Sequence, residues 1–337
     1  MTRRRIGGLL ATLAILVISG LTPQRAEAID LLETDDLTAG VNVYAAGVLG
    51  AEIFSNAPDD YGAFLSLARL KAYGSYEDLA EVNVQIGSTQ LAGDPSALRM
   101  ELLDAEAVIH PVEPLSIHVG KFKTPVSDEF LFSGPDLPFV GRALLRSFVP
   151  GRRIGLETFA SLQVDEVEVQ GQVGIFQPGR TTFSQPQGAL FTARGFVGWP
   201  FGLEVHVAYG DLFDNEFLAD GARVLPFDSP LDVAISYQNE GLDLHLEGLG
   251  VFDAPGDETI LAGYTHAMYR FGGEESVQVE PGVAYDIVEE GDVEHRVTGG
   301  VNLYWWQTRF QTLLDYRLRF TGAGERHAVF LALRGKL

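Results

Sequence analysis

Six basic residues gather in one short stretch of an otherwise strongly acidic chain. They are Lys121, Lys123, Arg142, Arg146, Arg152 and Arg153. The whole chain carries a formal charge of −22, which argues against a nucleic-acid partner because nucleic acids select basic surfaces. Guanidinium groups stay charged at physiological pH and bind phosphate or carboxylate through paired hydrogen bonds. The patch therefore predicts either an anion-binding constriction or ion pairs with carboxylates elsewhere in the protein.

Carboxylates recur on segments in which apolar and polar residues alternate. Val82, Val84 and Ile86 are apolar, for example, whereas the residues between them are polar. This period of two is typical of a β-strand with one apolar face and one wet face. The phase of the alternation predicts an acidic water-facing wall that includes Glu81, Glu106, Glu157, Glu166, Glu168 and Glu204. Acidic rings favour cations and basic rings favour anions, so we expect weak ion selectivity.

The alternation predicts an all-β protein, a transmembrane antiparallel β-barrel of about sixteen strands. A barrel of that size leaves an aqueous interior. Most of the segments suit the ~9–11 residues of a tilted strand that crosses a bilayer. They are 39–54, 61–73, 78–89, 98–110, 114–122, 152–162, 165–176, 189–199, 202–210, 229–238, 241–252, 259–270, 275–286, 294–306, 308–319 and 326–336.

The connections between these segments alternate in length. Short turns, such as 163–164, alternate with segments that are mostly longer and more polar, such as 211–229 and 287–293. This asymmetry is typical of outer-membrane barrels. Aromatic residues beside the short turns predict a girdle at one membrane interface, although aromatic residues also favour strands in general.

The N-terminus has the features of a secretory signal peptide. A basic start, an apolar segment over 6–21 and the small residues Ala26 and Ala28 predict cleavage after Ala28. We therefore expect a signal peptide over 1–28 and a barrel over 29–337 in the bacterial outer membrane, in contact with its lipid. The chain has no cysteine, which excludes disulfides and thiolate chemistry.

The longest break in the strand pattern runs over 123–151. Its prolines exclude a continuous strand, and its phenylalanines and leucines make it too apolar to extend into water. We expect this third external loop to fold into the barrel and to narrow the pore. A cap outside the barrel and a contact with another subunit are the alternatives.

The residues around this loop resemble the phosphate-selective porin O and P family. The similar residues are Gly120-Lys121-Phe122-Lys123, Pro125, Pro138-Phe139-Val140, Arg142, Val149-Pro150-Gly151-Arg152 and Gly155. The resemblance implies a homotrimer of sixteen-stranded barrels, an inward third loop, and transport of anions such as phosphate. Gly141 stands where an acidic residue is expected, and Leu337 stands where such barrels commonly have a terminal Phe.

These features predict a porin for passive diffusion of small hydrophilic solutes or ions. A closed structural or adhesive barrel is the alternative. His118, His206 and His245 lie on separate strands in the wet phase, which does not indicate a convergent catalytic or metal site. We expect no enzymatic activity, no metal and no cofactor.

Overall fold

In the computed structural model, the described residues are 29–34, 36–54, 60–91, 94–178, 188–213, 229–254, 258–273, 276–305 and 310–336. Almost all of them lie in strands. The strands are β1 (Ile29–Glu33), β2 (Leu37–Phe54), β3 (Asp60–Tyr76), β4 (Ala80–Leu91), β5 (Asp94–Val112), β6 (Leu115–Lys123), β7 (Arg152–Val164), β8 (Val167–Phe176), β9 (Ala189–Gly198), β10 (Leu203–Phe213), β11 (Ser229–Asn239), β12 (Leu242–Ala254), β13 (Glu258–Tyr269), β14 (Gln278–Glu290), β15 (Asp292–Trp305), β16 (Phe310–Thr321) and β17 (Gly324–Lys336).

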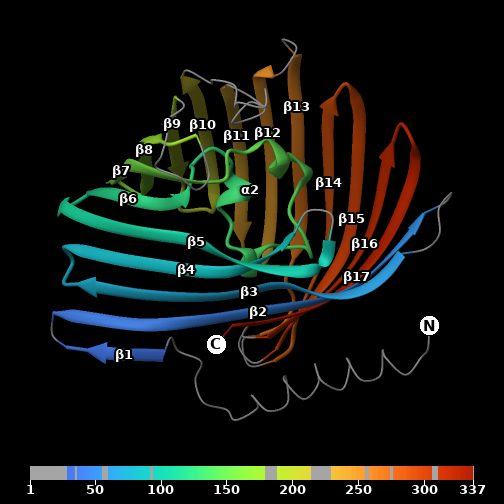
Figure 1. Cartoon of the computed structure of the whole chain (residues 1–337), viewed down its shortest axis with the longest axis horizontal. Coiled ribbons are helices and arrows are strands. Elements are labelled where there is room, and N and C mark those ends of the chain that lie inside the picture. The colour runs from blue at the N-terminus through green and yellow to red at the C-terminus, as the bar shows by residue number, and fades with distance from the viewer. Residues whose placement is uncertain are drawn as a thin grey trace.

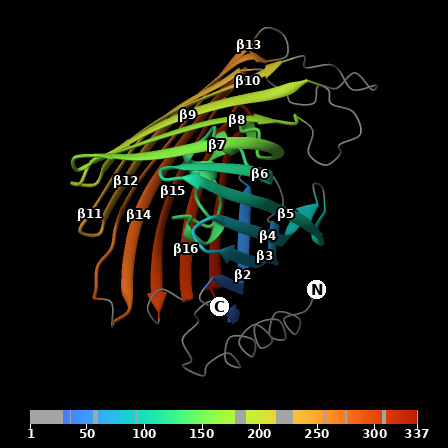
Figure 2. The same ribbon diagram turned by 90° about the vertical axis from the view of Figure 1, so that its left-hand side faces the viewer.

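Strands β2 to β17 form a ring of antiparallel pairs. Each strand pairs with its neighbour in sequence, and the last strand, β17, pairs with β2. The short strand β1 pairs with the start of β2, from Thr38 to Val41, whereas β17 pairs with the remainder, from Tyr44 to Phe54. Figures 1 and 2 show these strands curving around a common interior.

The two faces of the sheet differ as the alternation predicts. On β12, Leu244 and Leu246 are exposed on the outer face. His245 and Glu247, which alternate with them, are buried on the inner face. The same pattern of outward Val, Leu, Ile and Tyr recurs around the ring. None of the described helices is long and apolar enough to cross a membrane.

All sixteen predicted strands are confirmed to within a few residues at their ends. Strand β1 was not predicted, because its five residues are too short to show a clear period. The predicted longer connection over 287–293 is wrong, since β14 and β15 continue to Glu290 and Asp292 and only Gly291 joins them. Gly291 has a φ of 73°, a left-handed conformation that suits such a tight turn. The predicted signal peptide, 1–28, and most of the predicted connection 211–229 lie outside the described residues.

The segment between β6 and β7 lies within the ring. It contains the helix α2 (Asp128–Leu131) and the 3₁₀ turns η1 (Gly134–Asp136) and η2 (Leu144–Phe148). In both views the segment lies inside the curve of the strands (Figures 1 and 2). We call residues 124–151 the inner loop. Its inward position confirms the prediction made from its apolar composition.

Candidate functional site: the lumen and its inner loop

Wall carboxylates bind the backbone of the inner loop at three places. Glu247 of β12 accepts hydrogen bonds from Ser127 Oγ at 2.6 Å and from the Glu129 backbone N–H at 2.8 Å. Asp286 of β14 accepts one from the Leu144 N–H at 2.8 Å. Asp315 of β16 accepts one from the Val140 N–H at 2.6 Å. Hydrogen bonds to charged groups are stronger than neutral ones, so these contacts fix both ends of the loop.

Wall donors bind the loop's carbonyl groups in the same region. Arg334 of β17 donates to the carbonyls of Leu137 at 2.7 Å and Phe139 at 2.6 Å. Arg296 of β15 donates to the Arg142 carbonyl at 2.8 Å and also pairs with Asp286. Backbone groups that are buried away from water need such partners, and these bonds supply them to the irregular part of the loop.

Apolar side chains complete the attachment. Phe130 and Leu145 of the loop are almost fully buried, at 1% and 0% exposure, in one cluster with Leu249 and Tyr264 of the wall. The loop thus packs against the inner face of the second half of the sheet. Among β4 to β8, Phe122 and Phe176, near the ends of β6 and β8, belong to the same apolar cluster, and Lys123 of β6 donates to two loop carbonyls.

Two of the six basic residues predicted at the constriction stabilise the conformation of the loop by donating hydrogen bonds to its carbonyl groups. The Lys123 ammonium donates to the carbonyls of Leu131 at 3.0 Å and Phe132 at 2.9 Å. Arg142 donates to the carbonyls of Glu129 and Phe132, both at 2.7 Å. Its guanidinium lies 3.5 Å from the Glu129 carboxylate.

Three further bases lie in the loop or directly after it. The Arg146 guanidinium stacks 4.4 Å from the centre of the Phe130 ring. Arg152 forms a two-point pair with Asp104 of β5, at 2.7 and 3.2 Å. Arg153 is 1% exposed and donates to the Arg152 carbonyl at 3.0 Å. Pairing with a wall carboxylate, one of the two alternatives from the sequence, thus describes Arg152.

Lys121 lies on the outer face of the barrel, which differs from the position expected for it. It follows the outward Val119 by two residues and pairs directly with Ala105 and Ile154. Its ammonium donates to the Leu102 carbonyl at 2.6 Å. Because side chains alternate across a strand, this register directs Lys121 away from the lumen.

Five of the six predicted wall acids lie on inner-face positions of the strands. Glu166 does not, since it lies in the turn between β7 and β8, where Asp165 has a φ of 54° and ends the alternation. Glu168 accepts hydrogen bonds from Ser161 and Gln170, and Glu204 accepts one from Ser236. The remaining three, Glu81, Glu106 and Glu157, lie near one another on β4, β5 and β7.

Burial raises the pKa of two acidic residues of the loop. Burial raises the pKa of the Glu129 carboxyl, and the nearby Arg142 opposes this change. Burial also raises the pKa of Asp128, opposed by His206 and by Arg194, whose guanidinium lies 2.8 Å from it. The loop therefore inserts carboxyl groups into a space with little water.

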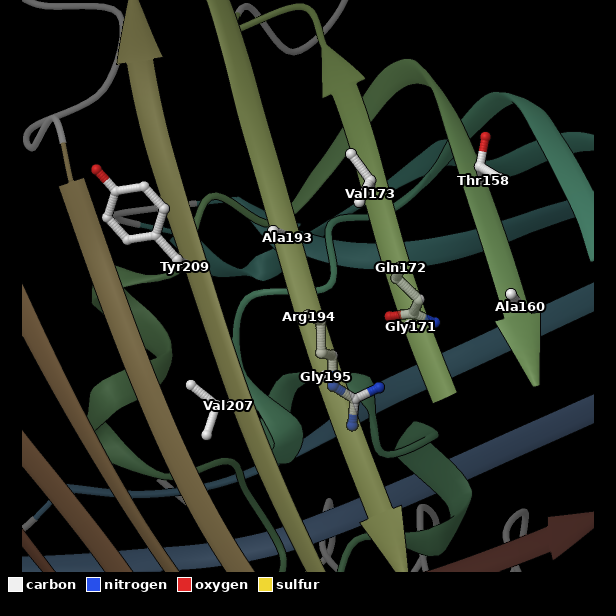
Figure 3. A pocket seen from close by; sticks show the side chains of 10 residues that line it. All are labelled: Thr158, Ala160, Gly171, Gln172, Val173, Ala193, Arg194, Gly195, Val207 and Tyr209. Carbon is white, nitrogen blue, oxygen red and sulfur yellow. The ribbon is translucent and has the colours of Figure 1, made fainter. Parts of the chain in front are cut away.

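No group of His, Asp or Glu side chains in the described ranges has the geometry to hold a metal ion. A depression of about 590 Å³ lies on β7 to β10, bordered by Val173, Val207 and Tyr209 (Figure 3). These three side chains are on the outer, apolar face, so the depression faces lipid rather than the pore.

Sequence reasoning missed the function of several wall residues. Glu247 and Asp315 were recognisable as inner-face acids from the alternation, but their bonds to the loop span 120 and 175 residues. Asn302 similarly donates to the Pro138 carbonyl at 2.8 Å. A lone polar residue in the wet phase of a strand was the available signal, and it does not identify a partner.

Comparisons with known proteins match the fold but not the sequence. No family model matches the chain, and no relative among curated proteins matches it. Two solved structures cover nearly all of it. One is an anion-selective porin from Comamonas acidovorans, with 10% identity and a TM-score of 0.64 over 90% of this chain and 100% of the other. The other is OmpT, an outer membrane protein of Vibrio cholerae in a trimer form, with 13% identity and a TM-score of 0.56 over 89% and 99%.

The chain has a porin-like outer-membrane barrel fold. At such low identity the likeness extends to the fold alone. The resemblance to the phosphate-selective O and P family in particular stays a prediction from the residues quoted above.

Proposed function

We propose that this protein is a porin of the bacterial outer membrane, through which small hydrophilic solutes and ions diffuse passively. The observation that carries the proposal is the ring of sixteen paired strands with an apolar outer face and a polar inner face. Rings of this size enclose an aqueous interior. The porin-like fold of the solved structures supports the same function.

The inner loop narrows the pore in this proposal. Its hydrogen bonds to β12 and β14 to β17 support this arrangement, in which solutes pass along the opposite wall. We further propose a homotrimer, which the family resemblance implies and which is consistent with the trimer form of OmpT.

Transport of anions such as phosphate has less support. The resemblance implies it, and a similar fold occurs in a porin described as anion-selective. However, Lys123 and Arg142 already bond to loop carbonyls, and Arg152 is paired with Asp104. These groups would have to exchange those contacts for a solute.

Single-channel recording in a planar bilayer tests the proposal. We expect stable open steps whose conductance grows with salt concentration. Insertion is first verified by protease protection. If the inserted protein then gives no conductance steps, the porin proposal is overturned and the alternative of a closed structural or adhesive barrel is favoured. A screen for ester and peptide hydrolysis tests the accompanying proposal that the protein is not an enzyme.

A further inference from the structure

Glu81, Glu106 and Glu157 lie on the inner face of β4 to β7, in the row of His118 or the row next to it. In the hydrogen-bonded register, Glu81 pairs with Val108, Val108 with His118, and His118 with Glu157. Glu81, His118 and Glu157 therefore occupy one row across β4 to β7. Glu106 lies one inner-face position further along β5, and its carboxylate is 2.7 Å from His118 Nδ1.

One oxygen of the Glu157 carboxylate lacks a hydrogen-bond partner in the described part of the chain. Glu157 is 5% exposed, and its Oε2 has no hydrogen-bond partner among the described residues. His118 cannot serve it, because Nδ1 bonds to Glu106 and Nε2 lies 2.9 Å from Ser116 Oγ. Burial makes this carboxylate costly to ionise unless a positive charge lies beside it, so the position favours an arriving cation.

No lysine or arginine is paired with these carboxylates through the strand register, that is, in the same row of directly opposed residues across β3 to β8. The row of Glu81 extends through Ser75 and Gly174 and contains no Lys or Arg from β3 to β8. The row of Glu106 extends from Tyr73 to Phe176 and contains none either.

The group is open to the lumen and continues toward the short turns. The side chains of Glu81, Glu106 and His118 are 51%, 18% and 23% exposed. A hollow of about 580 Å³ adjoins Glu81 at the end of the barrel with the short turns. Glu77, Asp78 and Glu113 also line this hollow, so a cation that enters from this end meets further acidic residues beside Glu81.

We propose that Glu81, Glu106 and Glu157 form a binding position for small monovalent cations, which makes the pore prefer cations to anions. This inference rests on the proposed porin function. A passing cation exchanges part of its water shell for carboxylate oxygens on either side of His118, and it leaves readily because neighbouring carboxylates offer the next contact. Anions are repelled by the same groups.

The reversal potential across a planar bilayer in a KCl gradient tests the inference. We expect the wild-type protein to favour K⁺ over Cl⁻. The variant Glu106→Gln/Glu157→Gln, which keeps the side-chain shapes, should lower the K⁺/Cl⁻ permeability ratio by about threefold to tenfold, as expected for two charges near the path of the ion. Glu289→Gln makes the same chemical change on the outer face, at an exposed position paired with Val293, and should leave the ratio unchanged.

The outcomes separate this inference from the proposed function. Open steps with a reversal potential on the chloride side, or a ratio that the double variant does not change, would overturn the cation-binding position and leave the porin intact. Absence of any steps after verified insertion would overturn the porin and this inference together. The wild-type measurement decides the sign of the preference even if the double variant fails to fold.

Discussion

Ser127 Oγ donates a hydrogen bond of 2.6 Å to Glu247, which joins the start of helix α2 to strand β12 on the inner wall of the barrel. The same hydroxyl accepts a hydrogen bond from the Phe130 N–H at 3.1 Å and so caps the helix. One serine thus sets both the local fold of the inner loop and its place in the lumen. This double contact makes Glu247 the best position at which to test how the loop is held.

Glu247→Ala should loosen the inner loop. The change leaves Ser127 Oγ, the Glu129 N–H and His245 Nε2 without their common acceptor, at a cost of about 3 kcal/mol or more in unfolding free energy. We expect larger and noisier conductance steps, together with a lower midpoint of unfolding in urea. Glu289→Ala on the outer face should change neither. Steps of unaltered size and noise would show that this contact does not hold the loop in place.

Lys123→Met and Lys121→Met should differ, although the two lysines are two residues apart. The first change removes the donor that binds the carbonyls of Leu131 and Phe132, so we expect altered conductance and a destabilisation of about 1–3 kcal/mol. The second affects an outer-face residue and should leave conductance as it is. Bilayer recording of both variants provides the comparison. Equal effects on conductance would contradict the outward register of Lys121.

Gly155→Ala should destabilise the barrel, whereas Gly171→Ala should not. A Cβ at Gly155 would lie 2.3 Å from Phe176 Cδ1 and 2.5 Å from the Ile175 carbonyl oxygen, whereas a Cβ at Gly171 meets nothing within 4 Å. Overpacking of this kind costs about 1–3 kcal/mol. Urea unfolding in lipid vesicles, followed by tryptophan fluorescence, measures both. Equal stability of the two variants would count against the close packing of β7 on Phe176.

Glu129 should make the stability of the wild-type protein depend on pH. Because burial raises its pKa, the folded state binds the proton more tightly than the unfolded state. Its contribution is therefore fully present below the unfolded pKa and is lost as the pH rises through the raised pKa. Relative to Glu129→Gln, which cannot titrate, the wild type should lose stability as the pH rises above about 4, the range in which an unfolded glutamate titrates, until the raised pKa is passed.

The midpoint of thermal unfolding in detergent, taken for both proteins across that range, measures this difference. A constant offset between the two would reflect only the altered hydrogen bond to the Ala143 N–H, which Glu129 Oε1 accepts at 3.2 Å. A wild type that gains stability relative to the variant as the pH rises would contradict the expected direction.

The strands could be predicted because each carries its own signal, the alternation of apolar and polar residues. The inward fold of the inner loop could also be predicted, since residues such as Phe130 and Leu145 must leave water. The contacts between the loop and the wall could not be predicted. The alternation shows which face of the sheet Asp315 lies on, but it does not show which residue Asp315 binds. Lys121 was grouped with the loop bases by closeness in sequence, whereas its strand phase, shared with Val119, places it outside.

The short strand β1 and the last strand β17 occupy successive lengths of the same edge of β2. Because Tyr44 pairs with Lys336 and Phe54 with Arg326, the ring closes only when the two most distant parts of the barrel sequence meet. Every earlier stage is an open, curled sheet with two unpaired edges, which invite pairing with other chains. Such long-range closure is slow. We therefore expect the seam at β2 to close late in assembly, and the edges of the open sheet to be prone to pairing with other chains until it does.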